Sequence, residues 1–350
     1  MKHRIGIIAD VQYADIDDVW NFQRTHKRRY RATIIALQNA IKYWSEFGDM
    51  DIVVDLGDAI DGFRNTTREM GMHALCNIMK EWSNYSSSHP EIPVIRLVGN
   101  HELYKFTRNE LIFGVADTDF RCSRPLNLST SVDRENSLYY SFKLRQDSPW
   151  RVVVLDPYDQ SVMRNGGGRV GHELTLENGG LDKLYTEMCQ KHNPNDILKA
   201  SDYFKDLQGV ESRWAPFNGG IDDEQLKWLE CVLQSASSNN EKLILLSHVI
   251  IHPRATPREN CHTLLWNYDR VLFLLAQYKS VKLCLYGHAH QEGYFHCPET
   301  GIHHITLASP LEAPIGEAEQ TFGLLEISDD EKTAYIRGNG MLTSRCLPLN

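Results

Sequence analysis

Residues 5–12, Ile-Gly-Ile-Ile-Ala-Asp-Val-Gln, join a short apolar run to two polar side chains, Asp10 and Gln12. The run over residues 5–9 has the length and β-branched composition of a buried strand. Four later apolar runs also end in polar residues, with the sequences Gly57-Asp58-Ala59-Ile60-Asp61, Gly99-Asn100-His101-Glu102, Ser247-His248 and Gly287-His288-Ala289-His290. Because ligands of open α/β sheets bind beyond the carboxyl ends of the strands, we expect all five ends to meet at one rim.

The side chains at this rim are of the types that bind metal ions. Aspartate, asparagine and glutamine supply oxygen and histidine supplies nitrogen, a mixture that suits manganese, iron or zinc. The glycines before Asp58, Asn100 and His288 permit sharp turns and a close approach to an ion. A single Gly-Asp or Gly-His pair arises often by chance, and a lone histidine is more often structural. Five such ends in order, each directly after an apolar strand, predict a metal centre.

The rest of the chain indicates an α/β fold. Apolar residues step by four and three over residues 30–44, and further helices are predicted at 69–82, 223–233 and 264–278. Asp222 is the predicted N-cap of the third of these helices. Other apolar runs with strand character lie at residues 52–56, 94–98, 152–155, 243–246, 281–285, 302–307, 323–327 and 333–337. Strand–helix alternation followed by clustered strands predicts two packed β-sheets flanked by helices.

Two polar segments interrupt this pattern. Residues 117–137 are irregular, and residues 158–220 are rich in glycine and asparagine and weakly periodic. Loops of this length in a compact domain are usually functional covers or binding loops. We therefore expect one domain, residues 1–350, in which residues 117–137 and 158–220 are cover or insertion segments.

Composition argues against several functional classes. The net charge of −9 disfavours a protein that coats nucleic acid, since phosphate backbones recruit basic surfaces. The glycines at residues 166–168 are not followed by Lys-Ser/Thr, so a phosphate-binding P-loop is not expected. No run approaches the ~20 apolar residues of a membrane helix, and the N-terminal apolar run is too short for a signal peptide. The eight cysteines form no C-x-x-C pair, so we expect free thiols in a reducing, cytoplasmic compartment.

The order of the motifs, D-x-Q, G-D-x-x-D, G-N-H-E, S-H and G-H-x-H, resembles the signature of the calcineurin-like metallophosphoesterases. Residues 9–15, Ala-Asp-Val-Gln-Tyr-Ala-Asp, are more specifically similar to the manganese-dependent ADP-ribose/CDP-alcohol diphosphatases, including Gln12 where most of the superfamily places histidine. Further family-like segments lie at residues 156–161, 192–195, 217–220 and 266–268. The resemblance implies a four-layer αββα sandwich with mixed sheets. It also implies hydrolysis of the diphosphate linkage of ADP-ribose and CDP-alcohols, such as CDP-choline, to a nucleoside monophosphate and a phosphorylated sugar or alcohol.

The resemblance also assigns metal ligands. It implies two divalent ions, Mn²⁺ preferred with Mg²⁺, Fe²⁺ or Zn²⁺ as alternatives, that share Asp58 as a bridge. The other ligands of the first ion would be Asp10, Gln12 and His290. Those of the second would be Asn100, His248 and His288. Two adjacent ions of this kind would activate a water and clamp the phosphoryl oxygens.

The remaining residues are assigned by the same resemblance. His101 would stabilise the phosphoryl charge or protonate the leaving oxygen. Asp61 would orient a metal ligand, although a turn-forming aspartate explains it equally well. The nucleobase pocket maps to Phe22, Val210 and Cys261, and the simpler interpretation is that Phe22 and Val210 pack the core.

Three alternatives stay open. The chain could be a cyclic-nucleotide or a glycerophosphodiester phosphodiesterase of the same superfamily, although both usually carry histidine at the position of Gln12. It could instead be a metal-binding scaffold without turnover, for which loss of ligands would be expected. Purple acid phosphatases carry tyrosine at the position of Asp61, so the sequence disfavours membership of the purple acid phosphatase branch. We expect a monomer that acts on small nucleoside diphosphates and binds neither nucleic acid nor membrane.

Overall fold

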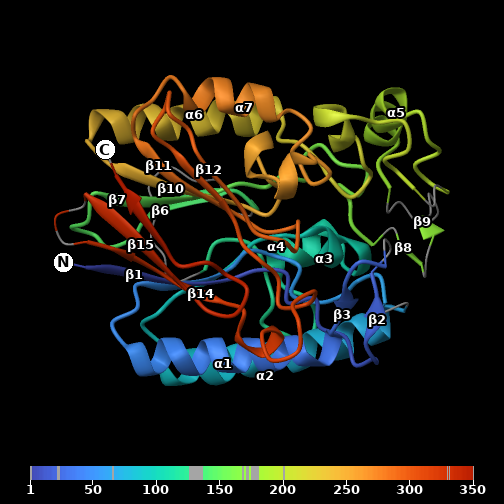
Figure 1. The fold of residues 1–350 in the computed structure, drawn as a ribbon, viewed down its shortest axis with the longest axis horizontal. Coiled ribbons are helices and arrows are strands. Elements are labelled where there is room, and N and C mark those ends of the chain that lie inside the picture. Colours follow the sequence, from blue (N-terminus) through green and yellow to red (C-terminus); the bar gives the residue numbers. More distant parts are fainter. Residues whose placement is uncertain are drawn as a thin grey trace.

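Two six-stranded β-sheets pack against each other in the computed structural model, and helices cover the outer face of each sheet (Figure 1). This arrangement confirms the predicted four-layer αββα sandwich. The structure describes residues 2–21, 24–64, 67–125, 137–167, 169–170, 173–174, 181–199, 202–328, 330 and 332–349. Within these ranges, none of the helices has the length and apolar character that spanning a bilayer requires.

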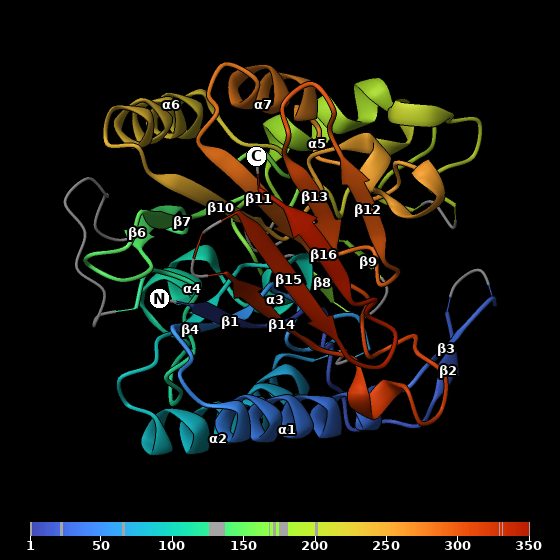
Figure 2. The same ribbon diagram turned by 60° about the vertical axis from the view of Figure 1, so that its left-hand side comes forward.

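The first sheet has the strand order β16-β15-β14-β1-β4-β5. Strand β1 (His3–Ile8) pairs in parallel with β4 (Ile52–Asp55), which pairs in parallel with β5 (Val94–Arg96). On its other side β1 begins an antiparallel series formed by β14 (Gly323–Ile327), β15 (Thr333–Gly338) and β16 (Arg345–Pro348). Helices α1 (Tyr30–Phe47) and α2 (Arg68–Ser88) lie on the outer face of this sheet (Figure 2).

The second sheet has the order β12-β13-β11-β10-β7-β6. Its centre is parallel and consists of β7 (Trp150–Val154), β10 (Lys242–Ser247), β11 (Val281–Tyr286) and β13 (His303–Thr306). The edge strands β6 (Tyr140–Lys143) and β12 (Gly293–His296) are antiparallel to their neighbours. Helices α6 (Asp223–Ser238) and α7 (Tyr268–Leu275) cover the outer face.

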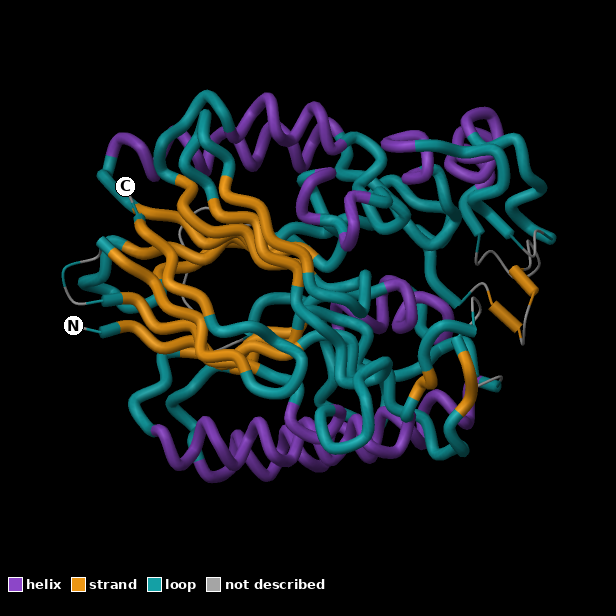
Figure 3. The backbone as a smooth tube through the Cα atoms, viewed as in Figure 1, coloured by secondary structure: helices purple, strands orange, loops and turns teal. Residues whose placement is uncertain are grey.

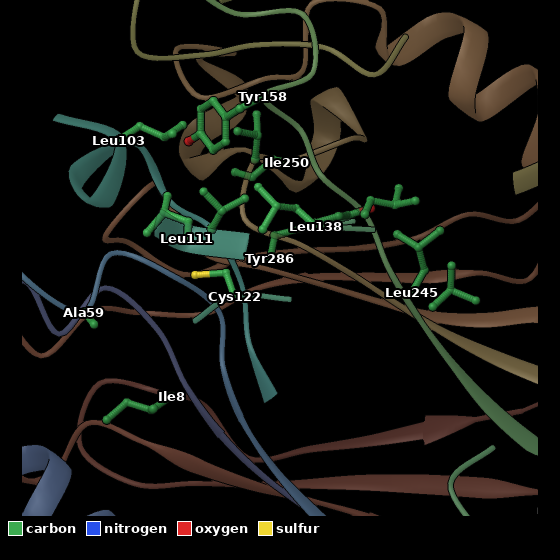
Figure 4. Packing of buried hydrophobic residues seen from close by; sticks show 14 of the residues in the cluster. Ile8, Ala59, Leu103, Leu111, Cys122, Leu138, Tyr158, Leu245, Ile250 and Tyr286 are labelled. Atoms are coloured by element: carbon green, nitrogen blue, oxygen red, sulfur yellow. The ribbon is translucent and has the colours of Figure 1, made fainter. Parts of the chain in front are cut away.

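Alternation along the strands builds two apolar layers. In β1, Ile5 and Ile7 point into the core between the sheets, whereas Ile8 belongs to the larger cluster between the sheets and the helices (Figure 4). Gly6 faces helix α1 so closely that a Cβ there would lie 2.7 Å from the ring of Trp44. Both faces of the strand are therefore buried, which explains why its sequence is a continuous apolar run.

Most predicted elements are present, with shifted ends. The side chain of Asp222 accepts a hydrogen bond from the N–H of Gln225 at 2.7 Å, which confirms the predicted N-cap of α6. The prediction for residues 264–278 is wrong at both ends. The helix begins only at Tyr268 because Leu264 bridges to Ile250 and the side chain of Asn267 bonds the backbone of Ile221.

The segment at residues 158–220, predicted as a cover loop, contains regular structure in its described part. Helix α5 (Lys183–His192) and a 3₁₀ helix (Gly209–Arg213) lie within it, as do the short strands β8 (Arg169–Val170) and β9 (Glu173–Leu174). Asn193 ties the end of α5 to the rest by donating to the carbonyl oxygens of Trp214 and Tyr203, at 2.6 and 3.0 Å. Of the other predicted cover, residues 126–136 lie outside the described residues.

The remaining short elements lie in the loops at the carboxyl ends of the strands. Figure 3 shows how these loops gather at one end of the two sheets. They include the hairpin β2 (Val19–Trp20) and β3 (Lys27–Arg28), helices α3 (Asn100–Lys105) and α4 (Arg108–Phe113), and 3₁₀ turns at Pro253–Ala255, Pro257–Glu259 and Ala318–Gln320.

Candidate metal centre

The five predicted strand ends converge between the two sheets. One ligand atom each of Asp58, His248 and His288 lies within 4.8 Å of the other two, and all three residues are buried. The carboxylate of Asp10 accepts the backbone N–H of His288 at 3.0 and 2.9 Å, which joins the end of β1 to the end of β11. Residues from both sheets therefore form one buried polar cluster, as the sequence predicts.

Unusual backbone conformations hold this cluster. Non-glycine residues seldom adopt positive φ angles, yet five of the seven predicted ligands do. They are Asp10 (52°), Gln12 (42°), Asp58 (58°), His288 (73°) and His290 (61°). Such strain persists only where the surrounding structure over-determines it, and it concentrates at functional sites.

Asp58 and His248 form the centre of the cluster. The Nδ1 of His248 lies 2.7 Å from the carbonyl oxygen of Leu56, so this nitrogen carries a proton. Its Nε2 faces Oδ2 of Asp58 at 3.3 Å and has no hydrogen-bond partner. Although burial alone would raise the pKa of Asp58, His248 and His101 hold it below the usual range. Burial opposes the charge on His248, but Asp58 raises the pKa of that imidazole to about 9.

The neighbouring groups titrate differently because, among the described residues, no side chain of opposite charge lies so close to them. Burial raises the pKa of Asp10 to about 6, with His248 and His290 acting in the opposite direction. Burial and the charge of His248 lower the pKa of His288 well below its ordinary value. Two carboxylates and three imidazoles thus share one buried volume, and a bound cation would neutralise the carboxylates.

The two predicted amide ligands, Gln12 and Asn100, have different hydrogen-bond partners. Gln12 donates its Nε2 to Oδ2 of Asp58 at 3.0 Å and lies 2.7 Å from Nε2 of His290, while its buried Oε1 has no partner. The amide of Asn100 lies between two phenols, with its Nδ2 donating to the oxygen of Tyr104 at 3.1 Å and its Oδ1 accepting from Tyr158 at 3.3 Å.

The donor set fits a divalent metal centre. A buried polar atom without a partner is costly and calls for an explanation such as an ion, and both Oε1 of Gln12 and Nε2 of His248 are of this kind. The loops also come close enough to need glycine. A Cβ on Gly99 would lie 2.1 Å from Oδ1 of Asp58, and one on Gly287 would lie 2.8 Å from Oδ2 of Asp10. Carboxylate, carboxamide and imidazole together match the ligand preferences of Mn²⁺ and Zn²⁺.

Glu102 supports the loop of Asp58, a role that the sequence analysis did not assign. Its carboxylate accepts the backbone N–H groups of Asp58 and Gly99, each at 2.9 Å, and of Ala59 at 2.7 Å. Glu102 is the third residue of α3, where glutamate commonly caps a helix. The sequence signal for this role is the position of Glu102 at the end of the Gly99–Glu102 motif.

His101 lies beside Asp58, but its ring is not part of the group of close ligand atoms that Asp58 forms with His248 and His288. Its backbone N–H donates to Oδ1 of Asp58 at 2.8 Å, and its ring Nε2 lies 4.0 Å from Oδ2. The N–H of Gly62 donates to Nδ1 of His101 at 3.0 Å, so in the neutral ring the proton sits on Nε2. Burial lowers the pKa of His101, which favours this neutral form.

Asp61 acts in a turn. Its Oδ1 accepts the N–H of Phe63 at 2.8 Å and also that of Arg64, the pattern of an aspartate that caps a turn. Its buried Oδ2 lies 3.8 Å from Nδ1 of His101. These contacts match the simpler of the two interpretations of this residue.

The predicted nucleobase pocket is described in part. Phe22 lies outside the described residues. Val210 is half-buried, and its carbonyl oxygen accepts Nη1 of Arg213 at 2.7 Å. Cys261 is buried with a φ of 58°, burial raises the pKa of its thiol, and the hydroxyl of Thr256 acts against that rise.

Two further residues contact the histidines of the centre. Oδ1 of Asn218 lies 2.7 Å from Nε2 of His288, and Oε1 of Glu312 lies 3.1 Å from Nδ1 of His290. Burial alone would raise the pKa of Glu312, but His290 and Arg28 lower it to about 2. Asn218 stands in the family-like segment 217–220, whereas no motif marks Glu312.

Comparison with known proteins agrees with this geometry. Residues 3–292 match the model of the calcineurin-like phosphoesterases. A manganese-dependent ADP-ribose/CDP-alcohol diphosphatase of Arabidopsis thaliana is 33% identical over 93% of this chain and 91% of its own length. A protein of the same name from Mus musculus is 32% identical over 98% of this chain and 92% of its own. The crystal structure of a dimetal phosphatase from Danio rerio superposes with a TM-score of 0.77 at 29% identity, over 99% of both chains.

Proposed function

Since the chain belongs to the calcineurin-like phosphoesterase family, we propose that it hydrolyses the diphosphate linkage of ADP-ribose and of CDP-alcohols such as CDP-choline. The products would be a nucleoside monophosphate and a phosphorylated sugar or alcohol. The relatives that share about a third of its residues over almost the whole chain carry the name of this activity. Their names also motivate the choice of Mn²⁺ as the preferred ion.

One observation supports this proposal above the others: buried metal-ligand atoms converge from five strand ends, and two of them have no partner. In our proposal Asp58 bridges two ions. Asp10, Gln12 and His290 complete one site, and Asn100, His248 and His288 complete the other. A metal-binding scaffold without turnover would have lost some of these residues, whereas all seven are in place.

The metal ions, when bound, supply positive charge that stabilises the phosphoryl oxygens and lowers the pKa of water. The protein supplies orientation and a hydrogen-bond donor. The ring of His101 holds a proton on Nε2, because its Nδ1 already accepts the N–H of Gly62. From this neutral ring the Nε2–H can donate a hydrogen bond to a phosphoryl oxygen and so stabilise the negative charge that develops there. We therefore assign stabilisation of the phosphoryl charge to His101.

We propose further that Phe22, Val210 and Cys261 bind the nucleobase. An aromatic face with apolar neighbours would stack a base. The backbone of Cys261 has a positive φ, as do those of Arg258 and Glu259 before it, so this turn is strained in the way that binding loops often are. Arg213 lies beside the segment of Val210, whose carbonyl oxygen accepts its Nη1 at 2.7 Å, and its Nε donates to the carbonyl oxygen of Trp266 at 2.8 Å.

The decisive experiment is a substrate panel on metal-stripped protein. Activity should vanish with chelator and return best with Mn²⁺. ADP-ribose should give AMP and ribose phosphate, and CDP-choline should give CMP and phosphocholine. A cyclic nucleotide and a glycerophosphodiester serve as competing substrates. Full activity without metal would refute the mechanism, and a clear preference for either competitor would refute the substrate assignment.

A further inference from the structure

The two histidines of the His288-Ala289-His290 motif are held by different ring nitrogens. His288 contacts the side chain of Asn218 through Nε2, at 2.7 Å. His290 contacts the side chain of Glu312 through Nδ1, at 3.1 Å. The donor and acceptor atoms of these two partners determine which nitrogen of each ring carries the proton.

The orientation of the Asn218 amide follows from its other contacts. Its Nδ2 donates to the carbonyl oxygen of Arg213 at 2.9 Å and to that of His262 at 2.8 Å. Both amide hydrogens are thereby used, so the atom that faces His288 must be Oδ1, which only accepts. Nε2 of His288 therefore carries the proton, and the lone pair lies on Nδ1. Asn218 is fully buried, which leaves its amide no alternative partner in solvent.

The carboxylate of Glu312 imposes the opposite choice on His290. Arg28 donates its Nε to Oε1 of Glu312 at 2.9 Å, and Asn21 donates to Oε2 at 3.3 Å. A carboxylate that receives these donors accepts from His290 as well, so Nδ1 of His290 carries the proton. The unprotonated Nε2 then points at the rim, where it accepts from Nε2 of Gln12 at 2.7 Å and lies 3.8 Å from Oδ1 of Asp10.

We infer that Asn218 and Glu312 are positioning residues that fix His288 and His290 in opposite tautomers, and that each of them controls a different metal site. Given the ligand sets of the proposed function, Glu312 acts on the site of Asp10 and Gln12, and Asn218 acts on the other. Residues that fix the tautomer of a metal-binding histidine typically change metal affinity about 10–100-fold when replaced.

The two positioning residues differ in charge. Glu312 brings a negative charge to the back of His290, which makes that imidazole a stronger donor, whereas Asn218 brings only a neutral amide to His288. The site that Glu312 supports also contains Gln12, whose neutral oxygen is a weaker ligand than a carboxylate or an imidazole. The charge of Glu312 thus strengthens the site that has the weaker ligand.

The test uses Glu312→Gln, Glu312→Ala and Asn218→Ala in the full chain, with Glu317→Gln as the exposed control. The first readout is the protonated ring nitrogen of His290 and His288 by nitrogen NMR of the metal-free protein. We expect His290 to carry its proton on Nδ1 in the wild type and to lose this preference in Glu312→Ala. An unchanged His290 tautomer in that variant would overturn the inference.

The second readout is Mn²⁺ binding. Glu312→Gln should weaken one of two Mn²⁺ sites about 10–100-fold and leave the other unchanged, with a larger loss in Glu312→Ala and none in Glu317→Gln. The double variant Glu312→Gln/Asn218→Ala should weaken both sites, because the residues act on different sites. Equal weakening of both sites by Glu312→Gln, or weakening of only one site in a folded double variant, would overturn the inference.

Two controls separate the possible failures. Wild-type protein that binds no Mn²⁺ would overturn the proposed function, while the NMR of the metal-free protein would still decide the tautomers. Asn218→Ala leaves two buried carbonyl oxygens without a donor and is expected to destabilise the fold. The Glu312 variants therefore test the inference without it.

Discussion

His101 offers the sharpest test of the proposed chemistry, because its two ring nitrogens have separate tasks. Nδ1 accepts the N–H of Gly62 at 3.0 Å and so supports the loop after β4. Nε2 carries the N–H that we assign to a phosphoryl oxygen. Asparagine at this position keeps an acceptor, Oδ1, close to where Nδ1 stood, and it removes Nε2. His101→Asn therefore removes this hydrogen-bond donor and retains the structural contact.

The expected losses differ greatly in size. One hydrogen-bond donor that stabilises the charge of a transition state contributes about 10²–10³-fold to the rate, which corresponds to about 3–4 kcal/mol. The structural loss is smaller. The ring of His101 packs against Tyr104 with centroids 5.1 Å apart, and such a pair contributes about 0.5–1.5 kcal/mol. A protein with about 5–15 kcal/mol of stability would stay folded after that loss, so a fall in kcat would report chemistry.

The assay compares kcat of the wild type and His101→Asn with Mn²⁺ at saturation, on ADP-ribose and on an activated nitrophenyl ester of a nucleotide. The variant should lose about 10²–10³-fold on both substrates, because the same negative charge develops on the phosphoryl oxygens of each. An unchanged kcat on either substrate would refute this role. Loss of a bound ion in metal analysis would show instead that His101 is a ligand.

Three further predictions follow from the same structure. Asp58→Ala should be the most damaging single change, because both proposed sites lose a ligand and the N–H of His101 loses its acceptor; near-normal turnover with two ions bound would contradict the bridging assignment. Gln12→His should change kcat/KM unequally for ADP-ribose, CDP-choline and a cyclic nucleotide, since a displacement of about 1 Å can cost ~100-fold; equal proportional changes would mean that Gln12 affects metal occupancy alone. Glu241→Gln should lower the free energy of unfolding by about 1–2 kcal/mol at pH 7. Burial alone would raise the pKa of Glu241, but Arg151 and Lys143 hold it below 4.5, so this contribution is present above pH 4.5 and diminishes as the pH falls through the lowered pKa. The two proteins should therefore differ less in denaturant melts at pH 3 than at pH 7.

The convergence of the predicted ligand side chains could be predicted because each of them directly follows a strand end. Each apolar run that ends in Asp10, Asp58 or His248 is a strand whose carboxyl end must lie at the rim. Neighbouring parallel strands deliver their next residues to the same edge, whatever the details of packing. Periodicity predicted α1 for a similar local reason, since its buried residues repeat at the helical period.

Contacts between distant segments escaped prediction because no local pattern encodes them. Glu312 lies 22 residues from His290 and Asn218 lies 70 residues from His288. Whether such a carboxylate or amide reaches a histidine depends on how the chain folds back, which periodicity does not describe. The prediction of where α7 begins failed for the same reason, because Asn267 is held by the distant backbone of Ile221.

The strained loops of the centre are held in place by backbone hydrogen bonds. A left-handed backbone costs a non-glycine residue about 1–2 kcal/mol, and five predicted ligands carry that cost. Together these costs are comparable to the whole stability of a typical domain, so the sheets and the hydrogen bonds of the loops must offset them. The N–H of Asp10 donates to the carbonyl oxygen of Gly57 at 3.1 Å and that of Gln12 to the carbonyl oxygen of Asp58 at 2.8 Å. These bonds extend the pairing of β1 with β4 beyond the strand ends and hold the ligand residues of both loops in register. The hydrogen bonds of the loops thus help to hold the predicted ligand side chains of both strand ends close to one another.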